Sequence, residues 1–339
     1  MRDIDQIHIQ NSELEPFGRV TDPGTAASAL LLQQRKTWPL LSGNYEGLNS
    51  VRVKRFSFDG FSVKVQFNPG RIVSSSAKVD AKSISERKCF LCRENLPAEQ
   101  RGILLDLNYM VLANPFPIFP EHLTIPHLDH IPQAITGAFG DMMEITRSLG
   151  SRFSLFYNGP KCGASAPDHL HFQAGNRGFL PVESELAHLV TTYGEPVPCD
   201  EALSVHAVDD TLRRYFVARS GSKDQLQLFF EACYQSFDEI SSSGEEPMMN
   251  IVAWYDEPVW TVLFFLREKH RPSHYFREDE GNILLSPASV DFGGVCITPL
   301  EKDYQKMNVE SLKEIFNEVS LNRDAFSEVI KRTCAEMYT

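Results

Sequence analysis

Residues 168–173 read Asp-His-Leu-His-Phe-Gln, and this stretch decides the chemistry and the fold expected of the chain. On a β-strand, side chains two residues apart point to the same face. His169, His171 and Gln173 would therefore line one surface. Leu170 and Phe172 would be buried behind them. Histidines that merely lie on a strand surface are the alternative, but two imidazoles and an amide in a row predict a site that faces one substrate.

The loop before this strand has the composition of an anion-binding turn. It runs from Asn158 through Gly159, Lys161 and Gly163 to Ser165. Glycines let backbone N–H groups approach a negatively charged group, and the lysine ammonium and the serine hydroxyl are further donors. The sequence therefore predicts a nucleophile next to a phosphate-binding loop.

Around this strand, the hydrophobic periodicity predicts an antiparallel sheet. Apolar residues alternate on both sides of a turn at Asp59-Gly60, which is typical of a hairpin over about 51–67. The pattern also predicts strands at 109–113, 122–125, 154–157 and 169–173, a helix at about 132–149 and a loop at the polar segment 74–76. Paired strands with one helix predict an α+β fold in which the helix packs on one face of the sheet.

The second half of the chain repeats parts of this pattern. We expect a helix around 226–237, strands at 251–255 and 259–266, and a helical tail at about 301–336. The strand at 122–126 has an echo at 263–267, because both are followed by histidine and proline, which suggests a diverged internal duplication. We divide the chain into an N-terminal arm (1–45), a motif-bearing half (46–185), a second half (186–300) and a helical tail (301–339).

The composition narrows the class of protein. The chain has 339 residues, of which 42% are hydrophobic and 23% charged, as in folded globular proteins. Its formal net charge of −12 argues against general affinity for nucleic acid or anionic membranes. No apolar run approaches the roughly 20 residues needed to cross a bilayer. The seven cysteines are odd in number and sparse, as in reduced cytoplasmic proteins. We expect a cytoplasmic protein that binds small molecules.

The motif and its flanking segments resemble the transferase branch of the histidine-triad (HIT) superfamily. This branch contains the galactose-1-phosphate uridylyltransferases, the diadenosine tetraphosphate phosphorylases and the GDP-hexose phosphorylases. The amino-acid sequence of the motif is most similar to that of the last group. Besides 169–174, the resemblance rests on 66–71 (Gln-Phe-Asn-Pro-Gly-Arg), 121–126 (Glu-His-Leu-Thr-Ile-Pro) and 131–133 (Ile-Pro-Gln). It covers about residues 50–180. It implies a HIT-like fold, here as two diverged halves of which only the first keeps the motif.

The resemblance also implies nucleotidyl transfer by double displacement. His171 would attack the α-phosphorus of a nucleoside-diphosphate sugar or a dinucleoside polyphosphate, and phosphate or a sugar phosphate would then remove the nucleotidyl group. A neutral imidazole is a competent nucleophile near pH 7. Gln173 would donate an amide N–H to a phosphate oxygen, and Ser165 or Lys161 would neutralise the leaving phosphate.

The alternatives are a hydrolase that passes the same intermediate to water and a non-catalytic nucleotide-binding protein. Related transferases often complete their sites across a dimer, which suggests a homodimer. The candidate catalytic residues are His171, Gln173 and His169. The candidate substrate-binding residues are Asn158, Gly159, Lys161, Gly163, Ser165, Arg71 and Asn68.

Cys89-x-x-Cys92 has the spacing of half a zinc site. His169 and one further histidine would complete a Cys₂His₂ set, and the possible fourth ligands are His122, His127 and His130. A redox-silent pair of core cysteines is the alternative. The position of the fourth ligand in small members of the superfamily favours His130.

Two basic clusters are further candidates for phosphate binding. Arg52, Lys54 and Lys64 on the first hairpin form either a phosphate surface or a solvated strand face, whereas Arg71 lies in the matched turn and is the stronger candidate. The residues 267–271 include Arg267, His270 and Arg271. They would either close the pocket over a sugar phosphate or form a charged loop, and we favour the loop.

Overall fold

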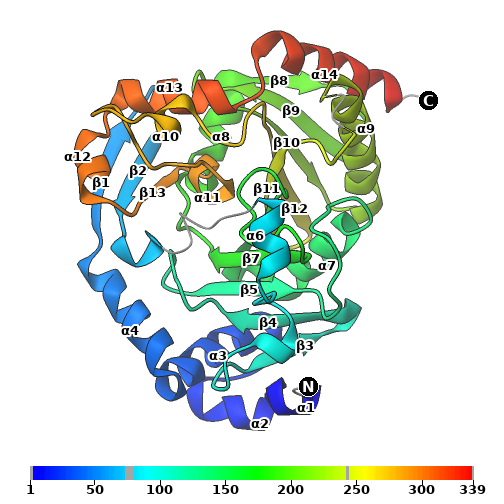
Figure 1. The fold of residues 1–339 in the computed structure, drawn as a ribbon. Coiled ribbons are helices and arrows are strands. Elements are labelled where there is room, and N and C mark those ends of the chain that lie inside the picture. Colours follow the sequence, from blue (N-terminus) through cyan, green and yellow to red (C-terminus); the bar gives the residue numbers. More distant parts are fainter. Residues whose placement is uncertain (1–2, 73–79, 242–243, 338–339) are drawn as a thin grey trace.

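The computed structural model describes residues 3–72, 80–241 and 244–337, and its centre is one large antiparallel sheet (Figure 1). The strands of this sheet are β3 (Gly102–Leu105), β4 (Tyr109–Ala113), β5 (His122–Pro126), β6 (Phe153–Asn158), β7 (His171–Asn176), β8 (Gly194–Val197), β9 (Leu203–Asp209), β10 (Arg214–Ser220), β11 (Met249–Asp256) and β12 (Val259–Leu266). They follow the order β3-β4-β5-β7-β6-β11-β12-β10-β9-β8. The predicted loop at 74–76 lies outside the described residues.

The strand order contains the same arrangement twice. The first half of the sheet reads β3-β4-β5-β7-β6, and the second half, taken from the opposite edge, reads β8-β9-β10-β12-β11. Helix α7 (Phe139–Leu149) connects β5 to β6, and α9 (Lys223–Ser241) connects β10 to β11 in the same way. The two halves meet at the antiparallel pair β6–β11. The predicted α+β fold with two halves of matching strand arrangement is confirmed, whereas the residue bounds of the four predicted domains stay a prediction.

The sequence echo that suggested this duplication paired the wrong strands. It matched β5 with the end of β12, whereas the topology makes β10 the counterpart of β5 and β12 the counterpart of β7. The β6–β7 connection is a long loop that carries Gly163 and Ser165, but the β11–β12 connection is a tight turn at Glu257-Pro258. The second half therefore lacks the loop that helps to build the site in the first.

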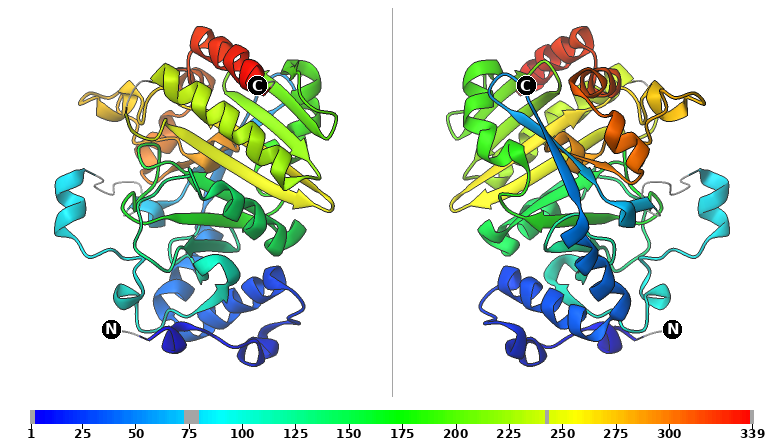
Figure 2. Two further views of the ribbon diagram at one scale, coloured as in Figure 1. Left: turned by 90° about the vertical axis from the view of Figure 1, so that its right-hand side faces the viewer. Right: turned by 90° about the vertical axis from the view of Figure 1, so that its left-hand side faces the viewer.

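Helices pack on both faces of the large sheet, in two groups. The helices are α1 (Ile4–Ile7), α2 (Asn11–Leu14), α3 (Pro23–Thr37), α4 (Pro39–Gly47), α6 (Ala81–Glu86), α7, α8 (Pro181–Tyr193), α9, α10 (Ser273–Phe276), α11 (Ser289–Phe292), α12 (Glu301–Lys306), α13 (Val309–Val319) and α14 (Arg323–Glu336). Helices α3, α7, α9 and α14 contribute buried apolar residues to one core with alternate residues of the strands, including Phe172. Figure 2 shows α9 lying across the strands of the second half.

The opposite face is covered mainly over the second half. A small sheet of β1 (Arg52–Ser57), β2 (Ser62–Phe67) and β13 (Val295–Thr298) packs there with α8, α11 and α13. β1 and β2 form the predicted hairpin, with Gly60 in the turn at a φ of +79°. Over the first half, α11 contacts β6, but a cavity remains above the outward residues of β5, β6 and β7. The site must therefore be sought there.

Two predicted boundaries are wrong for a common reason. Helix α7 begins at Phe139 instead of about 132, because the Gln133 side chain bonds Asn158 and His171 and so holds 131–138 as an irregular turn. Strand β7 begins at His171 instead of 169, because the His169 side chain turns toward Cys89. In both places, side-chain contacts distant in sequence override the local pattern.

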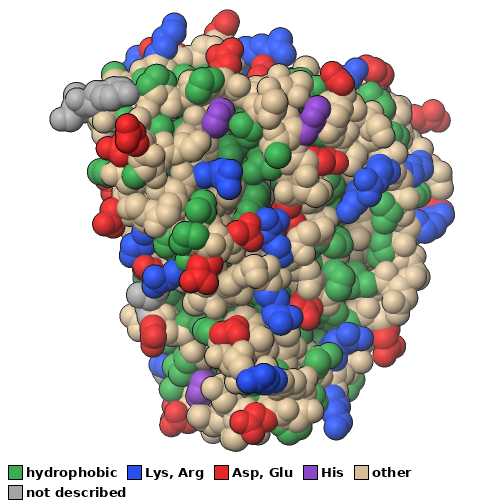
Figure 3. Space-filling model, turned by 180° about the vertical axis from the view of Figure 1, so that it is seen from behind, with side chains coloured by type: hydrophobic (Ala, Val, Ile, Leu, Met, Phe, Trp, Pro, Cys, Tyr) green, Lys and Arg blue, Asp and Glu red, His purple; other side chains and the backbone are tan. Residues whose placement is uncertain are grey.

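No helix in the described ranges is long and apolar enough to cross a membrane. On the face seen in Figure 3, basic and acidic side chains are interspersed, which fits the ordinary charged fraction and the acidic balance of the chain.

Candidate active site

A cavity of about 430 Å³ lies over the open face of the first half and is closed by segments from both halves. Its polar wall contains Arg71, Asn114, Thr124, Asn158, Ser165, His171, Gln173, His270, Arg271, Ser286 and Asp291. Its apolar wall includes Trp38, Leu40, Phe90, Pro97, Phe116 and Phe156. A few convergent polar groups in a mostly apolar pocket are typical of a small-molecule site.

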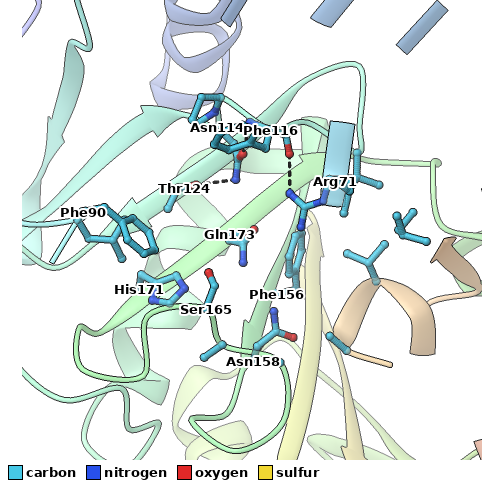
Figure 4. Close-up of a pocket in the computed structure, with 18 of the residues that line it drawn as sticks. Arg71, Phe90, Asn114, Phe116, Thr124, Phe156, Asn158, Ser165, His171 and Gln173 are labelled. Carbon is cyan, nitrogen blue, oxygen red and sulfur yellow. Dashed lines mark hydrogen bonds between the residues drawn. The ribbon is translucent and has the colours of Figure 1, made fainter. Parts of the chain in front are cut away.

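His171 lies at the start of β7 with its imidazole in this cavity (Figure 4). Its Nδ1 lies 2.8 Å from the carbonyl oxygen of His169, so Nδ1–H donates and Nε2 keeps its lone pair. Burial lowers the pKa of His171 to about 4, so the ring is neutral at pH 7. The ring has both the tautomer and the charge that a nitrogen nucleophile needs.

Gln173 lies on the same face of β7, and its amide is oriented by His122 on β5. The buried His122 accepts the backbone N–H of Ile118 at Nδ1 (3.2 Å), and its Nε2–H therefore donates to Oε1 of Gln173 (3.1 Å). Burial lowers the pKa of His122 to about 3, which keeps this ring neutral. With its oxygen engaged, Gln173 presents its NH₂ group to the cavity, as Figure 4 shows.

Asn158 presents a second amide. Its Oδ1 accepts from the Asn250 side chain (3.0 Å) and from the backbone and hydroxyl of Ser289 (2.9 and 2.8 Å), so the NH₂ group faces the cavity (Figure 4). Asn250 belongs to β11 and Ser289 to α11. Two residues of the second half thus orient one predicted site residue of the first half, and no motif in the sequence indicated them.

The loop 159–165 is only partly the predicted anion turn. Gly159 donates its N–H to Met249, and the N–H groups of Cys162 and Ala164 return to the Gly159 carbonyl, so these donors are used inside the protein. Lys161 lies outside the cavity wall and pairs with Glu245. Gly163 and Ser165 do line the cavity. Gly163 has a φ of +112°, and a Cβ there would lie 2.5 Å from Ala288, so only glycine fits.

Among the described basic residues of the first hairpin and of the turn that directly follows it (Arg52, Lys54, Arg55, Lys64 and Arg71), Arg71 alone lines the cavity. Its Nη1 donates to the Phe116 carbonyl (2.6 Å), and Asn68 beside it holds the Pro117 carbonyl (3.2 Å) instead of facing the cavity. Burial lowers the pKa of Arg71 to about 10, which leaves it charged at pH 7. Arg52 pairs with Glu301, Lys54 bonds the Tyr304 and Gln305 carbonyls, and Lys64 bonds the Phe179 carbonyl. These three side chains bond groups of the protein outside the cavity, so the interpretation as a solvated strand face fits them better than a phosphate-binding surface.

The segment 267–271 takes part in the site, against the favoured interpretation as a charged loop. His270 and Arg271 line the cavity, whereas Arg267 is buried behind it, and Lys269 pairs with Glu318 at the surface. Burial, followed by the charges of Arg271 and Arg267, lowers the pKa of His270 to about 4. The second half therefore supplies one wall of the site.

Cys89, Cys92, His130 and His169 form a cluster beside the cavity whose ligand atoms all lie within 4.8 Å of one another. The His169 Nδ1 is 3.3 Å from the Cys89 sulfur and the His130 Nδ1 is 3.1 Å from the Cys92 sulfur. His169 donates from Nε2 to the His127 carbonyl (2.8 Å), the outer contact that typically orients a metal-bound imidazole. His122 and His127 lie outside the cluster. Two sulfurs and two imidazole nitrogens at these separations fit a tetrahedral metal ion.

The cluster and the cavity share backbone. His169 turns its ring to the cluster and its carbonyl to His171, so the expected row of three side chains on one face is wrong for His169. Phe90, between the two cysteines, lines the cavity mouth (Figure 4). The cluster therefore supports both His171 and one wall of the cavity.

Glu246 is a buried carboxylate under the site loop. It accepts the Tyr157 hydroxyl (2.6 Å) and the Ile135 N–H (2.6 Å), and burial raises its pKa from the ordinary 4.5 to about 7. A raised carboxyl pKa stabilises the fold fully below pH 4.5, and this contribution is lost as the pH rises toward 7.

We expect Glu246→Gln, which mimics the protonated acid, to remove this pH dependence. Wild type loses this contribution as the pH rises and the variant does not. The free energy of unfolding of the variant minus that of wild type should therefore increase by roughly 3 kcal/mol between pH 4.5 and pH 8. Urea unfolding at several pH values measures it. The exposed neighbour Glu245→Gln is the control, and parallel pH curves for wild type and Glu246→Gln would contradict the assignment.

The fold and this cavity define an α+β protein of HIT-like architecture. Solved structures give the particular likeness: yeast Ap4A phosphorylase Apa2 matches with a TM-score of 0.53 at 16% identity, over 84% of this chain and 94% of that chain. Its complex with AMP gives 0.56 at 15% identity, over 85% and 97%. Its complex with Ap4A gives 0.53 at 14% identity, over 86% and 98%. The fold predicted from the resemblance is confirmed over most of both chains.

In the sequence, a family model described as "Domain of unknown function (DUF4922)" matches residues 30–176. This segment ends with β7 and contains the four cluster residues, His171 and Gln173. No curated protein sequence matches the chain significantly.

Proposed function

We propose that this chain is a nucleotidyltransferase or phosphorylase that acts through a covalent nucleotidyl-His171 intermediate. The observation that carries the proposal is the His171 ring: Nδ1–H is tied to the His169 carbonyl, and the neutral ring lines the cavity together with the donor amide of Gln173. The structural neighbour is named an Ap4A phosphorylase and has been seen with AMP and Ap4A, which supports a nucleotide substrate. The substrate class is a nucleoside-diphosphate sugar or a dinucleoside polyphosphate.

The first displacement uses the lone pair of His171 Nε2. It forms a bond to the α-phosphorus, and the bond from that phosphorus to its bridging oxygen breaks, so the rest of the substrate leaves with a terminal phosphate. Gln173 and Asn158 donate N–H groups to the charge that develops on the nonbridging oxygens. The hydrogen bond to His169 stabilises the cation that forms on the imidazole. The second displacement returns the electron pair to Nε2 and gives the nucleotide to phosphate or a sugar phosphate.

We further propose that Cys89, Cys92, His130 and His169 hold zinc. The mixed sulfur and nitrogen donors, and the absence of a cavity-facing ligand among them, suit a closed structural site. Zinc bound there would fix the position of residue 169 and supplies no step of the reaction. Ser165 stays a candidate for contact with the leaving phosphate because it lines the cavity next to His171. A homodimer stays a prediction.

Intact-protein mass spectrometry tests the proposal. Wild type and His171→Asn are incubated with nucleoside-diphosphate sugars and dinucleoside polyphosphates, without an acceptor. We expect wild type alone to gain the mass of one nucleoside monophosphate, which also identifies the base. Turnover that needs added phosphate would exclude a hydrolase. If no substrate gives an adduct or turnover, a binding role replaces the proposal.

His122 is expected to act as a positioning residue for Gln173. Gln173→Ala should lower kcat about 100-fold, because one preorganised donor is lost. His122→Phe keeps the ring volume among Phe119 and Phe156 but frees the Gln173 amide to rotate, so kcat should fall about ten-fold with KM unchanged. Steady-state kinetics of the two variants and the double variant measure this. The double variant should match Gln173→Ala, and additive losses would contradict the role.

A further inference from the structure

Three buried donor groups in the cavity wall have no hydrogen-bond partner among the described residues. They are Nε of Arg71, Nε of Arg271 and the Ser286 hydroxyl. Unpaired buried nitrogens also occur on arginines away from the cavity (Arg87, Arg101 and Arg177). Among the described residues, Arg71, Arg271 and Ser286 are the ones that combine an unpaired donor with a place in the cavity wall, where a ligand rich in acceptor atoms suits them. Arg271 and Ser286 belong to the second half, where neither the resemblance nor the family match extends.

One buried side chain anchors the backbone next to Arg271 and the backbone next to Ser286. The buried Arg267 guanidinium donates to the Pro287 carbonyl from Nη1 (2.8 Å) and to the His270 carbonyl from Nη2 (3.1 Å). These carbonyls belong to the neighbours of Ser286 and Arg271 in sequence. The Arg271 guanidinium in turn lies over the Tyr275 ring at 4.2 Å, which limits its motion. One rigid group therefore fixes both segments.

The same segments lie against Asn158 at the end of β6, the strand that pairs with the His171 strand β7. Nη1 of Arg267 also donates to Asn250 (2.5 Å), which donates to Asn158, and Ser289, three residues after Ser286, donates to Asn158 as well. Gln133 joins the Asn158 carbonyl to the His171 carbonyl with one amide nitrogen (2.9 and 3.1 Å). Arg271 and Ser286 thus belong to the wall that adjoins Asn158, across the cavity floor from the nucleophile.

The charge of this wall suits an anion. Asp291 is the one acidic residue among those that line the cavity, and its two oxygens accept the N–H groups of Ala288 and Ile297. Arg71 and Arg271 outnumber it, and a guanidinium forms paired bonds to phosphate oxygens.

We propose that Arg271 and Ser286 form a subsite for the phosphate group of the acceptor. The proposal rests on the function proposed above. An ionised phosphate oxygen held there attacks the phosphorus of nucleotidyl-His171; the new O–P bond forms, the N–P bond breaks, and its electron pair returns to Nε2. No proton is transferred. Because the departing phosphate of the first displacement leaves along the same path, the subsite serves both displacements.

Discharge of the isolated nucleotidyl-enzyme tests this. Wild type, Arg271→Leu, Arg271→Lys and Ser286→Ala are mixed with increasing inorganic phosphate or hexose 1-phosphate, and loss of the adduct mass is followed. We expect the phosphate concentration for half-maximal rate to rise about 30-fold in Arg271→Leu and several-fold in Ser286→Ala, with partial recovery in Arg271→Lys. Discharge by water should not change. The surface variant Arg277→Leu, whose side chain pairs with Asp279 outside the cavity, is the control.

Equal losses with both acceptors support recognition of the phosphate group. A wild-type response in Arg271→Leu, or a loss confined to the hexose phosphate, would overturn the subsite while leaving the covalent intermediate intact. If wild type forms no adduct, the proposed function fails first. Titration calorimetry with inorganic phosphate then tests the subsite alone, and equal binding by wild type and Arg271→Leu would overturn it.

Discussion

We expect His171→Ala to lower kcat for nucleotidyl transfer by at least about a thousand-fold. The proposed reaction depends on a nitrogen lone pair at one position, and His270, the other described histidine that lines the cavity, belongs to the opposite wall. His122 does not line the cavity and is bonded at both nitrogens. Covalent catalysis divides one difficult displacement into two easier ones, so loss of the nucleophile removes the whole route.

The fold of this variant should stay intact. His171 is buried, but its ring makes one internal hydrogen bond, and its backbone contacts to Gln133 do not depend on the side chain. We expect a Tm within a few degrees of wild type and the same affinity for a nucleoside monophosphate. kcat is measured with phosphate and substrate saturating. Activity within ten-fold of wild type would contradict the nucleophile assignment.

The sequence predicted most of the first half because its signals are local. Short apolar segments identified the strands that became β4, β5 and β6, and alternation on both sides of the turn at Gly60 identified the first hairpin. Spacing of two on one strand was enough to place His171 and Gln173 in one cavity. The pairing of Cys89 and Cys92 with His130 and His169 was also predicted, and the structure brings these four together.

The remaining features depend on contacts between distant segments. His169 and Gln173 are each two residues away from His171, so spacing alone treats them alike. The ring of His169 turns away from the cavity because it approaches Cys89. Lys161 looked like a phosphate ligand, but Glu245 pairs with it at the surface. His122 looked like a possible metal ligand, and its bond to Gln173 is visible only once β5 and β7 are adjacent.

The wall from the second half was beyond sequence reasoning for a different reason. Asn250, Arg267 and Ser289 act through one buried network around Asn158, and each is a common residue in an unremarkable segment. The charged segment 267–271, with a histidine and two arginines, was noticed, and the duplication explains how it reaches the site: β12 lies in the same sheet as β7.

The second large effect is expected from loss of the proposed zinc ion. The segment that carries Cys89 and Cys92 is attached to the protein by a small apolar cluster with Leu91 and Ala166, much less than the two main cores provide. A structural zinc ion contributes folding free energy directly, about 10–16 kcal/mol in small zinc-binding peptides. Without it, this segment should detach while the large sheet persists.

We therefore expect the double variant Cys89→Ser and Cys92→Ser to lose its zinc, from about one ion per chain to less than 0.1. Its Tm should fall by several degrees and its kcat by about 10- to 100-fold, because the His169 carbonyl no longer holds Nδ1 of His171 and Phe90 leaves the cavity wall. Cys199→Ser, at a free cysteine outside the cluster, is the matched control. Elemental analysis, thermal unfolding and kinetics measure the three effects.

Wild type purified without chelator that holds less than about 0.1 zinc per chain would refute the metal site. A zinc-free double variant with wild-type kcat would show that the cluster does not support the nucleophile.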